Sequence, residues 1–159
     1  MNKNDNWYSP PYIIEKAKLV LGTIDLDPAS CEYANRTVGA SKIYTAEDSG
    51  LEKPWIGRVW CNPPYSAKLL KHFTAKFLAE YQNGNMTEGI MLTNAGTDTL
   101  WSVPLRSGLQ AYTTGRLSFM LPDGTYKGKG SRGSCFTYFG NNREKFIETF
   151  SDICWFPNL

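Results

Sequence analysis

The 159 residues have the length of a single domain, and 42% hydrophobic with 14% aromatic residues are enough to build one core. The formal net charge of +2 argues neither for nor against a nucleic-acid partner, so local patches must decide. No apolar run approaches the roughly 20 residues of a membrane span, and the polar N-terminus lacks the hydrophobic region of a signal peptide. We therefore expect no membrane partner and a cytoplasmic protein.

The sequence gives little support for a metal site or for catalysis by a histidine base. The four cysteines are spaced without a CxxC pair, and the single histidine, His72, lies in a lysine-rich helical stretch. Neither a Cys/His zinc site nor a hydrolase with a histidine base is therefore expected. We predict reduced, mostly buried thiols and no metal.

The first helix and strand can be placed from their end signals. Ser9 is a typical N-cap and Pro10 a typical first helical residue, and apolar residues then recur at helical spacing until Gly22. Residues 23–26 have the pattern of a short strand that ends among acidic residues. An acid at such a strand tip can accept hydrogen bonds from ribose hydroxyls or lie near a cation.

The most distinctive stretch follows a predicted helix at 30–37 and a predicted strand at 42–45. The apolar run at 59–61 predicts a buried strand and ends abruptly in Asn62-Pro63-Pro64-Tyr65. Because proline has no N–H and a fixed φ, the two prolines stop the strand ladder and stiffen the loop. A rigid loop at the carboxyl end of a strand is where open α/β sheets bind ligands.

The residue types in this loop suit the methylation of an amine. An amine conjugated to a ring must become more tetrahedral before it attacks a methyl donor. The side-chain carbonyl of Asn62 and the backbone carbonyl of Pro63 can each accept one of its N–H groups and favour that state. Tyr65 offers a flat face on which a base removed from the duplex can stack. A plain strand-to-loop turn is the alternative.

The second half of the chain alternates further helices and strands. A long amphipathic helix runs from residue 66 to Gly84, and Lys68 at its start could meet a phosphate or simply face solvent. Thr97 is the predicted N-cap of a helix that Pro104 bends or shortens. The remaining predicted elements are strands at 88–93, 111–114, 117–121, 134–139 and 152–156 and a helix at 141–150. This alternation predicts one α/β domain over residues 1–159, with a largely parallel sheet flanked by helices and an antiparallel C-terminal hairpin.

A basic, glycine-rich loop separates the predicted strands at 117–121 and 134–139. No acid follows Asp123 in this loop, and its glycines allow the backbone to approach a phosphodiester closely. We expect a DNA-contacting hairpin, with a mobile tip made soluble by lysines as the alternative. The candidate DNA contacts are Arg116, Lys127, Lys129, Ser131 and Arg132.

These stretches together resemble a known family. Asn62-Pro63-Pro64-Tyr65 resembles the (D/N/S)PP(Y/F/W) motif of amino-group methyltransferases that use S-adenosylmethionine. From about residue 5 to about residue 140, the chain resembles the small phage-type DNA N6-adenine methyltransferases of the Dam family. The resemblance implies a reduced class I methyltransferase fold, which is Rossmann-like, and S-adenosylmethionine as cofactor. The supporting stretches are Trp7-Tyr8-Ser9-Pro10-Pro11-Tyr12, Asp25-Leu26-Asp27-Pro28-Ala29-Ser30, residues 44–51 and residues 57–65.

The resemblance also implies which residues hold the cofactor. Residues 7–10 resemble the motif that holds its methionine end, with a hydrophobic staple and helix cap as the alternative; they are Trp7, Tyr8, Ser9 and Pro10. The stretch beginning at Asp27 resembles the (D/E)P(F/A)xGxG loop around the amino-acid part; it comprises Asp27, Pro28, Ala29 and Ser30. Cys31 and Tyr33 replace the glycines of that loop.

Two assignments stay open among the acidic residues. Asp27 is our choice for the cofactor acid of the first strand, Asp25 could instead be the ribose-binding acid of the following strand, and an Asp-Pro turn without a cofactor is the third possibility. After the strand at 42–45, Asp48, or alternatively Glu47, resembles the acid that accepts the adenine amine of the cofactor. A plain acidic surface loop is the alternative there.

The implied function is methyl transfer from S-adenosylmethionine to N6 of a flipped adenine in double-stranded DNA, at a short palindrome such as GATC. Residues 116–133 and 94–108, the latter with Asn94, Thr97 and Asp98, are the candidates for recognising the target. The motif also occurs in enzymes that methylate RNA amines or protein glutamine, and the missing glycines leave open an inactive DNA-binding module. A phage-encoded enzyme would work in the bacterial cytoplasm, in defence evasion, restriction–modification or regulation.

Overall fold

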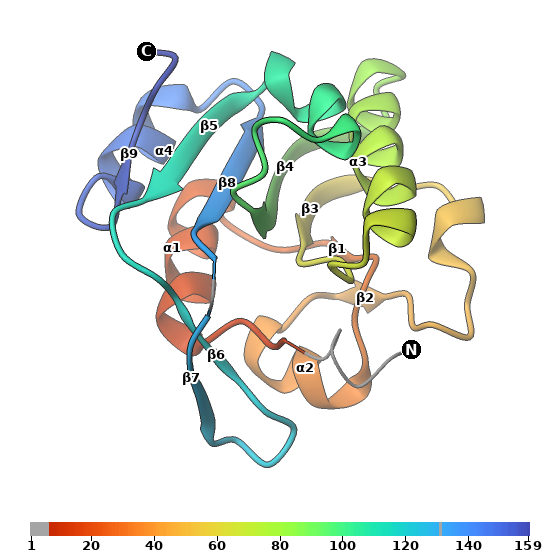
Figure 1. Cartoon of the computed structure of the whole chain (residues 1–159). Coiled ribbons are helices and arrows are strands. Elements are labelled where there is room, and N and C mark those ends of the chain that lie inside the picture. The colour runs from red at the N-terminus through yellow and green to blue at the C-terminus, as the bar shows by residue number, and fades with distance from the viewer. Residues whose placement is uncertain (1–6, 131) are drawn as a thin grey trace.

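A seven-stranded mixed sheet forms the centre of the molecule (Figure 1). The computed structural model describes residues 7–130 and 132–159. Four parallel strands make up one side of the sheet: β2 (Lys42–Ile43), β1 (Leu26–Asp27), β3 (Gly57–Cys61) and β4 (Met86–Asn94). Antiparallel pairs complete it, in the order β8 (Ser134–Phe139), β5 (Leu109–Thr113) and β9 (Cys154–Trp155). The predicted α/β class is confirmed.

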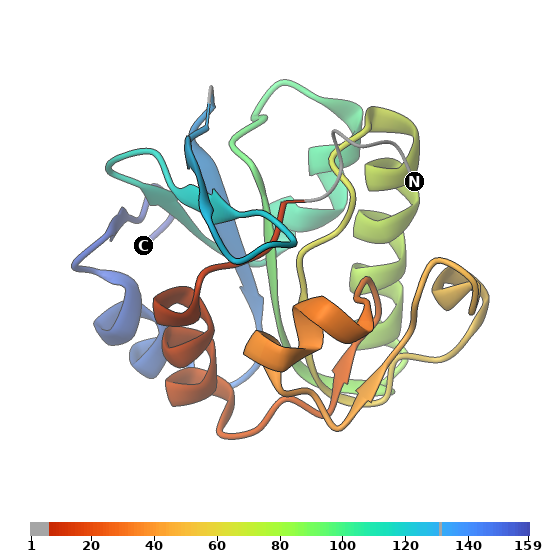
Figure 2. The same ribbon diagram turned by 90° about the horizontal axis from the view of Figure 1, so that it is seen from below.

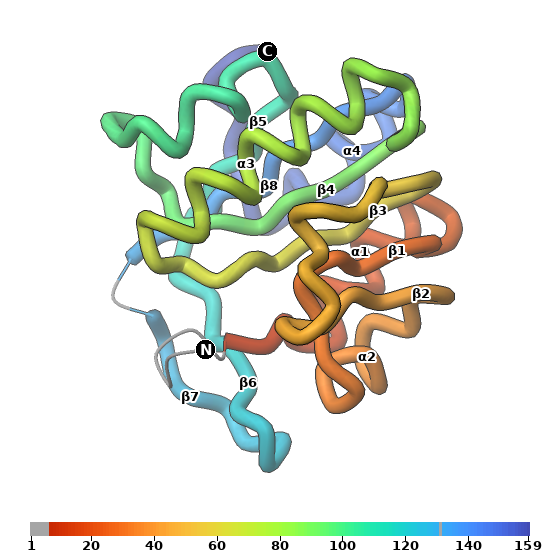
Figure 3. The backbone as a smooth tube through the Cα atoms, turned by 90° about the vertical axis from the view of Figure 1, so that its right-hand side faces the viewer, coloured from red at the N-terminus to blue at the C-terminus, as the bar shows by residue number. Residues whose placement is uncertain are grey.

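Helices cover both faces of the sheet (Figures 1 and 3). Side chains alternate along each strand, so neighbours such as Val59 and Trp60 enter different cores. Trp60 packs in the core that includes α1 (Pro11–Leu21) and α4 (Arg143–Phe150), whereas Val59 packs in the core that includes α3 (Ala67–Gln82) and the 3-10 helix η3 (Leu100–Ser107). The shorter α2 (Glu32–Val38) follows β1, and η2 (Gly50–Glu52) follows β2.

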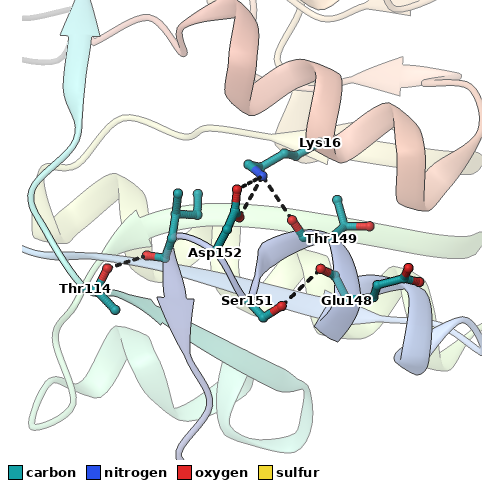
Figure 4. Close-up of polar contacts among 7 residues, drawn as sticks. Lys16, Thr114, Glu148, Thr149, Ser151 and Asp152 are labelled. Atoms are coloured by element: carbon teal, nitrogen blue, oxygen red, sulfur yellow. Dashed lines mark hydrogen bonds and ion pairs between the residues drawn. The ribbon is translucent and has the colours of Figure 1, made fainter.

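A polar contact joins the first helix to the end of the chain (Figure 4). Lys16 on α1 donates to both carboxylate oxygens of Asp152, at 2.8 and 2.9 Å, and to the carbonyl oxygen of Thr149, at 3.0 Å. This contact fixes α1 against the turn between α4 and β9.

The predicted antiparallel hairpin is present, but its second strand differs from the prediction. The sequence predicts that residues 117–121 pair with 134–139, but β8 enters the main sheet between β4 and β5 instead. β6 (Ser118–Met120) pairs with β7 (Tyr126–Lys129) in a separate two-stranded ribbon, which projects from the sheet beside residues 7–10 (Figure 2). The ribbon is therefore shorter than predicted, and two of the candidate DNA contacts lie on a strand rather than in a loop.

Several element ends also shift. The residue that precedes α1 is Pro10, with Pro11 first in the helix, so Ser9 is not the helix cap. The residue before η3 is Thr99 rather than Thr97, and the predicted bent helix is a 3-10 helix that contains Pro104. The first strand is Leu26–Asp27 instead of residues 23–26, which places Asp27 inside the sheet.

Candidate active site

The site is built where the strand order of the sheet reverses. From β1 the chain moves to β2 on one side, and from β3 it moves to β4 on the other. Because all four strands are parallel, their carboxyl ends share one edge of the sheet. Asp27 ends β1 and Asn62 follows β3 at that edge. Such a reversal is the usual ligand-binding place in open α/β sheets.

The amide of Asn62 is held by the segment before α1. Its Nδ2 donates to the carbonyl oxygen of Trp7, at 2.7 Å, and to Oγ of Ser9, at 3.0 Å. Its Oδ1 is buried and has no hydrogen-bond partner within residues 7–130 and 132–159. An unpaired buried acceptor costs free energy, so this atom is a strong candidate for binding an N–H group of a substrate.

Tyr65 closes the same loop. Its ring is partly buried and meets the ring of Phe119 on β6 edge-on, with centroids 6.2 Å apart. Its hydroxyl is also buried without a partner among the described residues, and burial raises the pKa of the phenol well above its ordinary value. Tyr65 is thus a neutral aromatic side chain that the hairpin holds in place.

Asp27 is a buried carboxyl group at the end of β1. It is 3% exposed, and its Oδ1 accepts a hydrogen bond from the backbone N–H of Ala29, at 3.1 Å. Burial raises its pKa from 3.8 to about 7, although hydrogen bonds from Ala29 and Ser30 act in the opposite direction. A cationic ligand beside this group would favour its ionised form.

A pocket of about 330 Å³ opens between the loops that follow β1, β2 and β3. Gly50 lines it at a point of close approach, because a Cβ there would lie 2.8 Å from the carbonyl oxygen of Pro28 and 3.0 Å from Cβ of Tyr44. The indole of Trp55 fixes this wall by donating to the Gly50 carbonyl oxygen, at 2.9 Å. The other lining residues are Pro28, Ala29, Ser30, Thr45, Ala46, Ser49, Leu51, Glu52, Pro64, Leu69 and Phe73.

None of the predicted acids is among the residues that line this pocket, although Asp27 directly precedes the lining residue Pro28. Oδ2 of Asp48 accepts hydrogen bonds from the backbone N–H and the hydroxyl of Thr45, at 2.8 and 3.0 Å. The backbone bond from Thr45 is the main reason why the pKa of Asp48 is lowered. Glu47 is exposed beside it. Asp25 lies before β1, where its carboxylate accepts the backbone N–H of Arg58 at 2.8 Å and ties together the amino ends of β1 and β3.

The segment at residues 7–10 contacts both the Asn62 loop and the residues that replace glycines. Tyr8 is bridged to Met120 on β6, with backbone N···O distances of 3.1 and 2.9 Å. The thiol of Cys31 donates to the Tyr8 hydroxyl at 3.6 Å, and the Tyr33 ring lies 5.5 Å from the Tyr8 ring. Burial is the main reason why the pKa of Tyr8 rises to about 12. Cys31 and Tyr33 thus support this segment.

The basic side chains lie on and around the hairpin. Arg116, Lys127, Lys129 and Arg132 are exposed, and Nζ of Lys127 lies 3.7 Å from the ring centroid of Trp7. Lys68 is exposed in the first turn of α3. The candidate Ser131 lies outside the described residues. In the segment 94–108, Leu100 is 83% exposed.

Sequence reasoning missed part of this site. It did not identify the pocket walls formed by Gly50, Leu51 and Phe73, although it did favour the stretch 44–51, and the helical spacing of Phe73 indicated only a core residue. The pattern around Phe119 predicted only a strand, yet its ring contacts both Trp7, at 5.5 Å, and Tyr65. The Trp7 carbonyl could not have been found, because a backbone acceptor leaves no signal in the sequence.

Two further features are absent from the described residues. Within the described residues, no three His, Cys, Asp or Glu side chains gather into a group that could hold a metal ion. No helix in that part of the chain is long and apolar enough to cross a membrane.

Comparison with known proteins identifies the family. No individual curated protein matches the sequence. A family model described as DNA N-6-adenine-methyltransferase (Dam) matches residues 1–145, which include the Asn62 loop, the pocket and the hairpin. The chain belongs to this Dam family and is a DNA adenine methyltransferase.

Proposed function

We propose that this enzyme takes the methyl group from S-adenosylmethionine and transfers it to N6 of an adenine that has left the double helix. One observation carries the proposal. Oδ1 of Asn62 is a buried acceptor without a partner in the described part of the chain, and it lies at the switch point of the sheet. The exocyclic amine of adenine is a donor that would satisfy it.

Asn62 and Pro63 would act on the amine by accepting its two N–H groups. Both acceptors favour a tetrahedral nitrogen and the positive charge that develops on it during transfer. The amide of Asn62 is already held by two hydrogen bonds, so little reorganisation is needed when the base arrives. Neither acceptor titrates, and their contribution should not vary with pH.

The residues at the ends of β1 and β2 fit the cofactor. S-adenosylmethionine supplies an electrophilic methyl group on a cationic sulfonium. Asp27 is a buried carboxyl group that no described cation pairs with, and a bound cation would lower its pKa from about 7. We assign the cofactor acid to Asp27 rather than Asp25, because Asp25 already binds a backbone N–H before β1. Asp48 accepts hydrogen bonds from Thr45 through Oδ2, and its Oδ1 lies 3.8 Å from Nζ of Lys53 in an exposed ion pair, so an adenine amine would compete with Lys53 for that oxygen.

Double-stranded DNA would meet the basic side chains of the hairpin. Lys127, Lys129 and Arg132 are exposed there and can contact phosphates without reading sequence. The extruded adenine would stack on Tyr65, whose ring Phe119 supports from the side. This arrangement joins DNA binding and the Asn62 loop through one small ribbon.

The experiment compares Asn62→Ala with the wild type in two assays. The variant should bind S-adenosylmethionine with wild-type affinity in calorimetry, yet transfer labelled methyl to DNA about 100-fold more slowly or worse, because a preorganised acceptor is lost. Asn141→Ala, an exposed position before α4, is the matched control and should transfer at the wild-type rate. Wild-type transfer by Asn62→Ala would refute the assigned role.

A further inference from the structure

We infer that the Trp7 carbonyl and the Ser9 hydroxyl are positioning groups that point Oδ1 of Asn62 toward the acceptor amine, so that asparagine rather than aspartate fits position 62. The inference rests on the proposed function, because it assumes that Oδ1 meets the amine. It adds a role for residues 7–9 that differs from holding the cofactor.

The orientation of the amide follows from hydrogen-bond types. A side-chain amide has a donor end and an acceptor end, which only its partners can distinguish. The Trp7 carbonyl can only accept, and it lies 2.7 Å from Nδ2 of Asn62. Turning the amide over would place two acceptor oxygens at that distance. Ser9 can donate or accept, so the Trp7 carbonyl decides the orientation and the Ser9 hydroxyl takes the second N–H, at 3.0 Å.

The positioning segment is itself fixed. Ser9 is 6% exposed and does not cap α1, which leaves its hydroxyl for Asn62. Tyr8, between the two positioning residues, is bridged to Met120 by two backbone hydrogen bonds. The Trp7 ring packs edge-on against Phe119, with centroids 5.5 Å apart. A segment held at each residue can impose an orientation on a neighbouring side chain.

The same geometry separates asparagine from aspartate. In an Asn62→Asp variant, a carboxylate oxygen would replace Nδ2 and face the Trp7 carbonyl oxygen without a proton between them. The neutral acid would instead donate its O–H to that carbonyl and keep the other oxygen as an acceptor. Only the protonated form therefore reproduces the amide, and the variant should lose activity as pH rises through the pKa of the new carboxyl group.

The first test reads the amide directly by NMR of the free protein. The two Nδ2 proton signals of Asn62 are assigned by their disappearance in Asn62→Ala. Ser9→Ala should shift one of them upfield, because that proton loses its acceptor, whereas Ser151→Ala should move neither. Ser151 is a suitable control because its hydroxyl donates to the Glu148 carbonyl oxygen at the end of α4 and makes no hydrogen bond with the Asn62 loop among the described residues (Figure 4). Unmoved signals in Ser9→Ala, or equal shifts in Ser151→Ala, overturn the inference.

The second test is kinetic and separates this inference from the proposed function. Ser9→Ala should lower kcat about fivefold, the usual effect of one neutral hydrogen bond, and leave the Kd for S-adenosylmethionine unchanged. Ser9→Thr, which keeps a hydroxyl, should recover most of that loss. At saturating S-adenosylmethionine, the transfer rate of Asn62→Asp divided by the wild-type rate at the same pH should fall as pH rises, because the wild type shares every other titrating group, Asp27 included. A ratio that does not change with pH overturns the asparagine requirement. A wild-type protein that methylates no adenine refutes the proposed function instead, and the NMR signals still test the positioning.

Discussion

At the scale of single residues, Asp27 and Asn62 each lower the free energy of unfolding, and the fold itself does not require either arrangement. Asp27 is a buried acid with a raised pKa, and Asn62 has a buried acceptor without a described partner. Both lie at the edge of the sheet where β1 and β3 end. Groups that lower stability and converge on one place are typical of sites built for a ligand.

Asp27 should make stability depend on pH. Its folded pKa of about 7 lies above 3.8, so the folded state holds its proton more tightly than the unfolded chain. Its favourable contribution is complete below the unfolded pKa and is lost as pH rises through about 7. Between about pH 5 and about pH 8 the loss is roughly 3 kcal/mol.

Asp27→Asn removes this titration. The variant should therefore gain unfolding free energy relative to the wild type at about pH 8 and much less at about pH 5, while its affinity for S-adenosylmethionine falls. Urea unfolding of both proteins at the two pH values measures the difference. An equal difference at both values would mean that Asp27 keeps an ordinary pKa in the fold.

The sequence was informative about residues whose types carry the chemistry. Asn62-Pro63-Pro64-Tyr65 could be recognised because two prolines directly after an apolar run end a strand and fix the loop that follows it. The Trp7 carbonyl that binds Asn62 could not be recognised, since it is a backbone group 55 residues earlier in the chain. Ser9 shows the same limit: its position favoured a helix cap, and only the fold reveals that its hydroxyl bonds Asn62.

At the scale of elements, the β6–β7 ribbon connects its exposed basic residues, Lys127 and Lys129, to the Asn62 loop. Phe119 on β6 is 4% exposed and contacts both Trp7 and Tyr65. The sequence did not predict β7, because Lys127-Gly128-Lys129 has the composition of a loop and its strand pairing comes only from β6. By contrast, α3 was predicted well because its apolar residues keep helical spacing along its whole length.

Phe119→Ala should loosen this connection. Replacing a buried phenylalanine by alanine costs about 3 kcal/mol or more, so the variant should lose stability by that order. Hydrogen exchange should accelerate at the bridged amides of Tyr8 and Met120, and the β4 amides should stay protected in the remaining folded state. Tyr126→Ala, at a position 58% exposed on β7, is the control and should change stability by less than about 0.5 kcal/mol. Unchanged exchange at Tyr8 in Phe119→Ala would show that the ribbon does not hold the N-terminal segment.

At the scale of the whole molecule, the net charge of +2 gives little general attraction for DNA, so binding should depend on where the basic residues lie. The strand order was outside the reach of the sequence, because β8 and β5 pair through contacts that alternation alone does not specify. The class of fold could be predicted from the sequence, since alternating strands and helices already indicated a sheet between helices.

The hairpin should set the salt dependence of DNA binding. Lys129→Ala combined with Arg132→Ala should reduce the slope of log K against log salt by about 2, because each phosphate contact contributes about 0.9. Arg143→Ala combined with Lys145→Ala, on α4 and away from the hairpin in Figure 1, removes the same charge and should leave most of the slope. Equal slopes for the two double variants would remove the hairpin from the DNA interface.

The most direct test of the proposed reaction is an analysis of the methylated products. In three parallel reactions, the wild-type protein is incubated with labelled S-adenosylmethionine and one acceptor, which is unmethylated double-stranded DNA, RNA or protein. The labelled products are then identified by mass spectrometry. We predict label in N6-methyldeoxyadenosine from the DNA, with Asn62→Ala reduced to background. Label confined to RNA or to protein glutamine, or no label with any acceptor, would contradict the proposed reaction.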